Sequence, residues 1–585
     1  MRPFRNLPTV ATVALGVICA FGAPSCILAQ GKAPTSNAAA AAEKAASSDT
    51  VLAAMAAELD RSKAKLKMGD LAAPYYVEYH VTDVQQFYAE AAFGGLRASE
   101  STHSRSLRVV VRVGDYKHDS YGPGPGLGVA DSAPIEDDQT AFRRALWLAT
   151  DRAYKAATEA LATKQANQTQ FTGDQGYDDF SHEQPLQSLE PVAKLTVDVK
   201  PWTDMLVRST DLFRSDPKLN SLAASARFVV TNKYFVNSEG TVTREGSEID
   251  TLQLSGSTQA ADGMRLVRSP YFVAAKQSDL PSPEKFQSAM ADMIATLKTL
   301  RDAPIVEENY DGPVLFAPDA SADVVATLIG DNVLGERPRA GDTSRTSGAF
   351  ASSYKSRVLP TFLSAVDDPT AGAFANKSLV GSYQVDDEGV RAQKVALVDK
   401  GILTNYLVGR EPIRDFPESN GHARGASGQS PHPSFSNLIV TASESLSPGD
   451  LKKKLIDMCR DEGKPYCYFA QSLLVEQSFA GGGRGRGRGA VFNVEMIPVL
   501  LYRIYVSDGH QELVRGGVFG DLDTRSLRGD LVAAGNDPIV DNREGAIPQA
   551  VVAPSLLFDD LEIRRTDVKN PKMPEYEAPA LTAGR

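Results

Sequence analysis

Histidine is the residue type best suited to binding a transition metal or transferring a proton near neutral pH. A zinc peptidase of the common kind needs two histidines one helical turn apart, with a glutamate beside the first. No pair in this chain has that spacing; the seven histidines are His80, His103, His118, His182, His422, His432 and His510. Only His422 and His432, in NGHARGASGQSPHPSF, are near each other. They are either two loop ligands or two surface residues of a Gly/Pro/Ser-rich loop.

Nucleophilic catalysis has one weak candidate. The stretch SSYK places Ser352 three residues before Lys355, a spacing that Ser/Lys acyl enzymes use. The Ser-Asp-Asn and Lys-Thr-Gly elements that accompany this spacing in such enzymes are missing, and so is a Gly-x-Ser-x-Gly elbow. The sequence therefore gives little support for an acyl enzyme.

Carboxylates cluster at two places, VDDPT with Asp367 and Asp368, and VDDEGV with Asp387 between Asp386 and Glu388. Carboxylate oxygens are suitable ligands for Ca²⁺ or Mg²⁺. The same residues beside Pro or Gly are also typical of tight turns, in which Asp accepts hydrogen bonds from its own backbone. We favour the turn interpretation.

The Gly/Arg stretch AGGGRGRGRGAVF carries Arg484, Arg486 and Arg488 on a glycine backbone. Such cationic segments can contact single-stranded nucleic acid. The whole chain, however, has a formal net charge of −11, which gives no general attraction to nucleic acid. We therefore predict a loop between strands that contacts an acidic or extended ligand, and no nucleic-acid partner.

The N-terminus has the pattern of an export signal, because two arginines in MRPFRN precede an apolar run and small residues. The expected cleavage follows Ala29; a lipoprotein cleavage before Cys26 is the less favoured alternative. No later run reaches the roughly 18 apolar residues of a membrane span. The mature protein is therefore expected to be periplasmic or secreted, where Cys459 and Cys467 could form a disulfide or remain two buried thiols.

Alternating Val/Tyr-rich runs and amphipathic runs predict an α+β protein, with an α/β N-terminal domain, a middle domain and a predominantly β C-terminal domain. Hairpin signals recur late in the chain, as at Asp399-Lys400-Gly401 and Asp508-Gly509. The predicted division is a signal peptide (1–29), an Ala/Ser-rich linker (30–49), the N-terminal domain (50–175), the middle domain (176–308), the C-terminal domain (309–570) and a tail (571–585).

Within the third unit, RVLPTFLSAVDDPT, GSYQVDDEGVRAQKVALVDKGILTNYLVGRE, NGHARG, PHPSFSNLIV and YRIYVSDGHQELVRGGVF follow one another in order. In this series the chain resembles the C-terminal domain of the TldD/PmbA family. The similarity extends more weakly upstream, over ALWLATDRAYKAATEALATK and YFVNSEGT. The resemblance implies a β-rich C-terminal domain beside an α/β domain, and dimers that enclose a chamber. It also implies zinc peptidases of unfolded or small peptides, together with companion members that lack the zinc ligands.

The family's zinc motif, His-Glu-x-x-x-His, falls on IGDNVL in the helical stretch DVVATLIGDNVLGERPR. Ile329 stands at the first histidine, Gly330 at the glutamate and Leu334 at the second histidine. The family's C-terminal cysteine ligand has no counterpart in VDNREGAIPQAVVAPSLLFDDLEIRR. The remaining polar residues, Asp331 and Asn332, are adjacent and therefore point in different directions. We predict that no metal is bound here.

The leading hypothesis is an exported companion or scaffold subunit that forms a dimer, with a zinc-bearing relative as the suggested partner, and that binds extended peptide without a cofactor. One alternative is an active metallopeptidase with non-standard zinc ligands, drawn from His422, His432, Asp367, Asp368 and Asp387. Another is a homodimeric peptide-binding protein of the cell envelope.

Overall fold

The computed structural model describes residues 48–121, 128–168, 176–338, 342–480 and 491–566. Within these ranges the chain forms three large β-sheets and seven α-helices, so the α+β class predicted from the sequence is confirmed. The helices are α2 (Thr50–Lys65), α3 (Gln139–Gln168), α4 (Val199–Thr210), α5 (Pro283–Asp302), α6 (Pro318–Leu328), α7 (Pro448–Asp461) and α8 (Thr524–Gly529).

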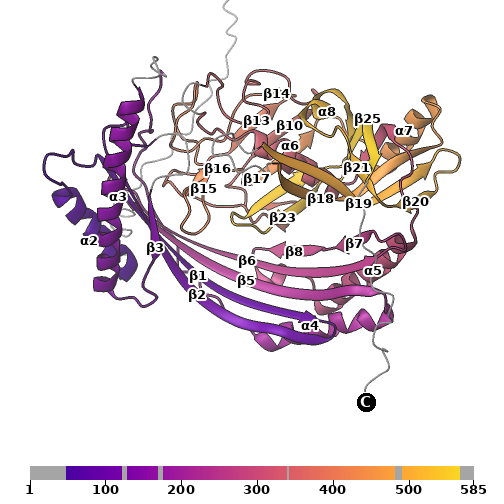
Figure 1. The fold of residues 1–585 in the computed structure, drawn as a ribbon, viewed down its shortest axis with the longest axis horizontal. Helices are drawn as coiled ribbons and strands as arrows, with labels where there is room; N and C mark the ends of the chain where they lie inside the picture. The colour runs from indigo at the N-terminus through magenta and orange to yellow at the C-terminus, as the bar shows by residue number, and fades with distance from the viewer. Residues whose placement is uncertain (1–47, 122–127, 169–175, 339–341, 481–490, 567–585) are drawn as a thin grey trace, which may run out of the picture.

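The largest sheet has the order β3-β2-β1-β5-β6-β4, with β7 and β8 also paired to β6. Its neighbours are antiparallel except for β4 and β6. The strands are β1 (Tyr76–Ala92), β2 (Gly95–Arg112), β3 (Val129–Ser132), β4 (Gln187–Leu189), β5 (Leu219–Asn237), β6 (Val242–Gln259), β7 (Arg265–Arg268) and β8 (Tyr271–Ala274). The four long strands curve beneath the C-terminal half of the molecule (Figure 1).

Strands from the expected N-terminal domain (50–175) and middle domain (176–308) belong to this one sheet. Along β5, buried residues alternate with less buried ones, which is the pattern of a strand with one face in a core. β1 pairs with β5 continuously from Glu78↔Asn237 to Ala92↔Ala223. The structure therefore joins the two expected domains through a shared sheet.

Helices cover the sheet at both ends, and each end has its own apolar core. At one end, α2 and α3 pack against residues such as Val77 and Val109. At the other, α4 and α5 pack against residues such as Phe228 and Leu254 on the outer face (Figure 1). Leu500, from the C-terminal half, also belongs to this second core, so the two halves of the chain share packing.

Two further sheets build the C-terminal half. One has the order β14-β13-β10-β17-β24-β23, and the other β20-β19-β18-β9-β25-β21 with β22 on β25. The first comprises β10 (Leu363–Asp367), β13 (Val395–Asp399), β14 (Ile402–Leu403), β17 (Asn437–Ala442), β23 (Ile539–Arg543) and β24 (Gln549–Ala553). The second comprises β9 (Tyr310–Phe316), β18 (Tyr466–Ala480), β19 (Val491–Tyr505), β20 (Gln511–Val514), β21 (Gly517–Phe519), β22 (Leu531–Ala534) and β25 (Leu556–Arg565).

Two small hairpins complete this half, β11 (Ala373–Phe374) with β12 (Lys377–Ser378), and β15 (Ala423–Arg424) with β16 (His432–Pro433). Helix α6 contacts both β18 and β24, which belong to the two different sheets of the C-terminal half. Its residues Val324, Val325 and Leu328 lie in the core shared by these sheets. The stretch with the degenerate zinc motif is thus at the centre of the C-terminal half.

Candidate functional site

The segment that the resemblance assigns to zinc binding is apolar and tightly packed. Helix α6 ends at Leu328, and Gly330–Asn332 continue as a short 3-10 turn. Ile329 is 1% exposed and lies in the C-terminal core. A Cβ atom on Gly330 would lie 2.7 Å from ring carbons of Phe435, so the ring occupies the space that a side chain would need. Leu334 packs on the same core and forms a backbone bridge to Leu407.

A zinc ion does not fit this segment. Zinc in proteins is held by imidazole nitrogen, thiolate sulfur or carboxylate oxygen, and Ile329, Gly330 and Leu334 offer none of these. A glutamate in place of Gly330 would also collide with Phe435. Across the described ranges, no three His, Cys, Asp or Glu side chains gather in a way that could hold a metal ion.

The two polar residues of the segment do different things. The Asn332 amide donates to the carbonyl oxygens of Thr327 and Leu328 at 3.2 and 3.3 Å, and its oxygen accepts from the backbone N–H of Ala349 at 2.8 Å. Asn332 therefore satisfies backbone groups at the end of α6. Asp331 is exposed beside it.

A chain of charged groups lies next to α6, at the contact between the large sheet and the C-terminal half. The Tyr271 hydroxyl of β8 donates to Asp541 at 3.2 Å, and Arg543 bonds both Asp541 and Asp323 at 2.7 Å. Burial raises the pKa of Asp323 to about 6, against the opposing effect of Arg543. Sequence reasoning missed this group, because its members come from three distant segments.

The two histidines of the candidate loop are not brought together as a ligand pair. His422 is fully buried: its Nδ1 is 2.9 Å from the carbonyl oxygen of Asn420, and its Nε2 is 3.0 Å from Asp367. His432 is exposed and pairs across the small hairpin with Arg424. Asp367 also accepts from the backbone N–H and hydroxyl of Ser436, so the His422 pair is part of an internal network.

The carboxylates of the two acidic stretches accept hydrogen bonds mainly from nearby backbone. Asp368 accepts from the N–H and hydroxyl of Thr370. Asp386 accepts from the N–H groups of Glu388, Val390 and Ala423, and Asp387 accepts from that of Gly425; the distances are 3.0, 2.8, 3.0 and 2.8 Å. The bonds from Thr370, Glu388 and Val390 are those of tight turns, whereas the bonds from Ala423 and Gly425 tie the second stretch to a distant segment.

Asp387 has a second role, because it meets a lysine from the large sheet. Lys233 Nζ lies 2.8 Å from both of its carboxylate oxygens. Burial alone would raise the pKa of Asp387, but Arg424 and Lys233 outweigh it and lower that pKa to about 2. The pair joins β5 to the C-terminal half.

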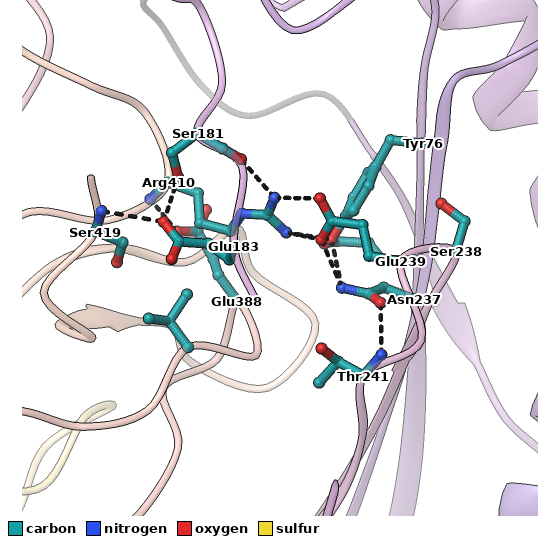
Figure 2. A network of polar contacts seen from close by, with 12 residues as sticks. Tyr76, Ser181, Glu183, Asn237, Ser238, Glu239, Thr241, Glu388, Arg410 and Ser419 are labelled. Carbon is teal, nitrogen blue, oxygen red and sulfur yellow. Dashed lines mark hydrogen bonds and ion pairs between the residues drawn. The ribbon is translucent and has the colours of Figure 1, made fainter. Parts of the chain in front are cut away.

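A polar network at the contact between the large sheet and the C-terminal half, called the seam below, surrounds Arg410, which is fully buried (Figure 2). Its guanidinium bonds both oxygens of Glu239 at 2.7 and 2.8 Å, the Ser181 carbonyl at 2.6 Å and the Tyr76 hydroxyl at 3.1 Å. Its backbone N–H donates to Glu388 at 2.6 Å. The network thus ties the C-terminal half to β1 and to the turn after β5, a structural role that could not be assigned from local sequence patterns.

Of the other residues singled out in the sequence, some lie within the described ranges and others lie outside them. Ser352 and Lys355 are both exposed, and the Lys355 ammonium lies over the Tyr354 ring, 5.0 Å from its centre. Cys459 of α7 and Cys467 of β18 are joined in a disulfide. Outside the described residues lie the signal segment with Cys26, most of the linker, the C-terminal tail, and Arg484, Arg486 and Arg488.

Residues 309–565 match the family model of the PmbA/TldA metallopeptidase C-terminal domain. The chain belongs to the TldD/PmbA family. Two curated archaeal proteins called metalloproteases are similar to it. One, from Methanothermobacter thermautotrophicus, is 41% identical over 87 residues, 15% of this chain and 16% of that protein. The other, from Methanocaldococcus jannaschii, is 24% identical over 250 residues, 40% of this chain and 48% of that protein. This TldD/PmbA chain thus spans at most about half the length of either archaeal relative.

Solved structures show the same fold over most of the chain. TldE from Thermococcus kodakarensis superposes with a TM-score of 0.58 at 13% identity, covering 87% of this chain and 99% of that one. A Thermotoga maritima protein described as a modulator of a DNA gyrase superposes with a TM-score of 0.55 at 16% identity, covering 84% of this chain and 96% of that one.

Among the described residues, no helix combines the length and the apolar character needed to cross a membrane.

Proposed function

We propose that this TldD/PmbA-family protein is an exported companion or scaffold subunit that binds no zinc of its own and serves a peptidase assembly acting on unfolded or small peptides. The observation that carries the proposal is the packing at the end of α6. Ile329 is buried in the core, and Phe435 fills the space in front of Gly330. A buried Ile contributes about 1.5 to 3 kcal/mol relative to exposure, so these positions suit packing rather than coordination.

Extended peptide is the ligand class that the sheets favour. The six-stranded sheet ends at β23, which pairs as a strand within the described part of the chain with β24 alone, while its Asp541 and Asn542 side chains bond Tyr271 and Val273 of β8. An extended peptide can add to such an edge through main-chain hydrogen bonds, whatever its sequence. Export is supported by the leader pattern at the N-terminus.

Metal analysis of the purified mature chain tests the non-metal role. After incubation with zinc and removal of the excess, we expect zinc well below one ion per chain and no cleavage of unfolded peptides. One zinc ion per chain, lost to a chelator together with peptide cleavage, would contradict the proposal. If zinc were bound, His432→Ala would test whether His432 is one of its ligands. His432 is exposed, so its side chain can be removed without opening the core.

Affinity purification from the native host tests the companion role separately. Recovery of a relative that carries the His-Glu motif is the expected result. Recovery of this chain alone would favour the homodimeric alternative instead.

A further inference from the structure

A small cavity lies in the seam, between the large sheet and the loop that joins β15 to β16. Residues of β1, β2, β5 and β6 form its floor, and Gly425 to Pro431 form its roof together with Asp386 and Asp387. Its volume is about 40 Å³, which is room for about three water molecules or for the end group of a larger molecule. Among the described residues that line it, none belongs to the degenerate zinc segment. The cavity is therefore separate from that segment.

The cations that line the cavity are already paired. Lys233 Nζ bonds both carboxylate oxygens of Asp387, and the Arg108 guanidinium lies 3.7 Å from the buried Glu78. Burial alone would raise the pKa of Glu78, but His80 and Arg108 outweigh it and lower that pKa to about 2. Glu78 is thus a carboxylate that balances the charge beside it. An anionic ligand would find no spare positive charge among these side chains.

Two side chains of the floor, in contrast, have acceptor atoms without a partner among the described residues. Glu245 Oε1 accepts from the N–H groups of Gln384 and Val385, whereas its Oε2 accepts from no described group. His80 Nε2 lies 3.0 Å from Glu78 and donates to that carboxylate, so Nδ1 of the neutral imidazole is an acceptor. No hydrogen bond to this Nδ1 comes from the described part of the chain.

The strand register brings these two acceptors to the same small area. His80 on β1 is opposite Phe235 on β5, and Lys233 on β5 is opposite Glu245 on β6. Thr82, opposite Lys233 on β1, adds a hydroxyl to the floor. His80 and Glu245 are thus two strand spacings apart, about 10 Å across the sheet, and their side chains span part of that distance. A small group that donates several hydrogen bonds fits between them.

We propose that this cavity binds a primary ammonium group, either the N-terminus of a peptide or the end of a lysine side chain, with Glu245 and His80 as its acceptors. An ammonium has three N–H donors and one charge, which match a carboxylate oxygen, an imidazole nitrogen and the Thr82 hydroxyl. Burial raises the pKa of Glu245 to about 7, so ionising this carboxyl alone costs free energy that a bound ammonium offsets. The choice of a peptide as the source of the ammonium rests on the proposed function.

Isothermal titration calorimetry of the full mature chain tests the site with an unfolded hexapeptide of Gly, Ser and Ala and with its N-acetylated form. Acetylation removes the charge and the ammonium donors, so we expect it to weaken binding by about 10-fold or more. An N-acetylated peptide with one lysine distinguishes the two sources. Recovered binding assigns the site to the lysine ammonium, and continued loss assigns it to the N-terminus. This comparison uses the wild type alone.

Two variants locate the effect. Glu245→Gln should weaken binding of the unmodified peptide by about 10-fold or more and leave the acetylated form unchanged, with the exposed Glu444→Gln as its control. Thr82→Leu should fill the cavity without removing a charge. Val84→Leu is its matched control, because Val84 lies two residues along the same face of β1 and does not line the cavity.

The outcomes separate this site from the proposed function. Equal affinity for the free and acetylated peptides, or unchanged affinity in Glu245→Gln and Thr82→Leu, would overturn the site and leave peptide binding intact. No binding of either peptide or of ethylammonium would overturn both. Binding of ethylammonium that Glu245→Gln abolishes, without peptide binding, would support the site and contradict the peptide-binding role.

Discussion

Glu245 lies where the large sheet meets the turn before β13, and its environment makes it a titrating group near neutral pH. Its Oε1 accepts from the backbone N–H groups of Gln384 and Val385 at 3.0 and 2.7 Å. Burial raises the pKa of Glu245 to about 7, although Arg424 opposes the shift. Burial also raises the pKa of two nearby carboxyl groups, Asp386 and Glu388.

A raised carboxyl pKa has a defined effect on stability. The unfolded chain releases its proton from Glu245 near pH 4.5, whereas the folded chain keeps it to about pH 7. The free energy of unfolding should therefore fall as pH rises from 5 to 8, by up to about 3 kcal/mol for this residue. Glu245→Gln, which stays neutral, should lose less stability over that range in urea titrations at each pH.

The exposed Glu444 provides the control, because Glu444→Gln should follow the wild type at every pH. Since Asp386 and Glu388 also titrate in the wild type, the informative quantity is the difference between Glu245→Gln and wild type. Parallel pH curves for the two proteins would show that Glu245 does not carry the predicted penalty.

At the scale of elements, the end of α6 shows how a helix terminus has been filled by packing. Ile329 and Leu334 contribute to the C-terminal core, and the Asn332 side chain bonds the last carbonyls of the helix. Gly330 is closely packed, because ring carbons of Phe435 lie 2.7 Å from the position that a Cβ atom would take. A side chain there requires Phe435 to move.

Gly330→Ala should therefore lower the free energy of unfolding by about 1 to 3 kcal/mol, as overpacked core positions do. Phe435→Leu, combined with Gly330→Ala, should recover part of that loss by making room. Gly372→Ala is the matched control, since no atom lies within 4 Å of its Cβ position. Equal thermal unfolding midpoints for Gly330→Ala and Gly372→Ala would argue against this packing.

Local chemistry in the sequence predicted many elements, whereas long-range pairing could not be predicted. Ser282 before Pro283 and Ser447 before Pro448 signal helix starts, and both side chains cap their helices. Asp399-Lys400-Gly401 signals a hairpin, and Lys400 and Gly401 have the positive φ values that such a turn needs. The pairing of β1 with β5 joins residues more than 130 positions apart, and the parallel pairing of β9 with β18 joins residues more than 150 apart. No local pattern specifies such partners.

The candidate site shows the same contrast between what local sequence predicts and what depends on long-range contacts. The sequence alone indicates that Ile329, Gly330 and Leu334 cannot bind zinc. It could not place Phe435, more than 100 residues away, against Gly330, nor Tyr271, Asp323 and Arg543 in one polar chain. Buried partners that come from different sheets depend on the tertiary fold.

At the scale of the whole molecule, buried polar contacts join the large sheet to the C-terminal half. Phe180 lies between two guanidinium groups, with Arg112 Cζ at 3.7 Å and Arg410 Cζ at 4.0 Å from its ring centre. Arg410 continues to Glu239 and Tyr76, and Lys233 bonds Asp387. Leu500 adds apolar contact to the same seam. These contacts predict that the two halves unfold together.

Arg410→Ala tests this coupling, because it leaves Glu239 without its bidentate partner inside the seam. We expect a loss of about 3 to 5 kcal/mol, as for other buried ion pairs that lose one member. Lys200→Ala removes an exposed pair with Asp204 and should cost no more than about 0.5 kcal/mol.

The two halves can be monitored separately. The two tryptophans of the chain, Trp147 and Trp202, both lie in the first half, so their fluorescence reports on that half. Hydrogen exchange of β13 and β17 reports on the other. Both signals should shift together in Arg410→Ala, whereas an unchanged fluorescence midpoint beside a destabilised C-terminal half would contradict coupled unfolding.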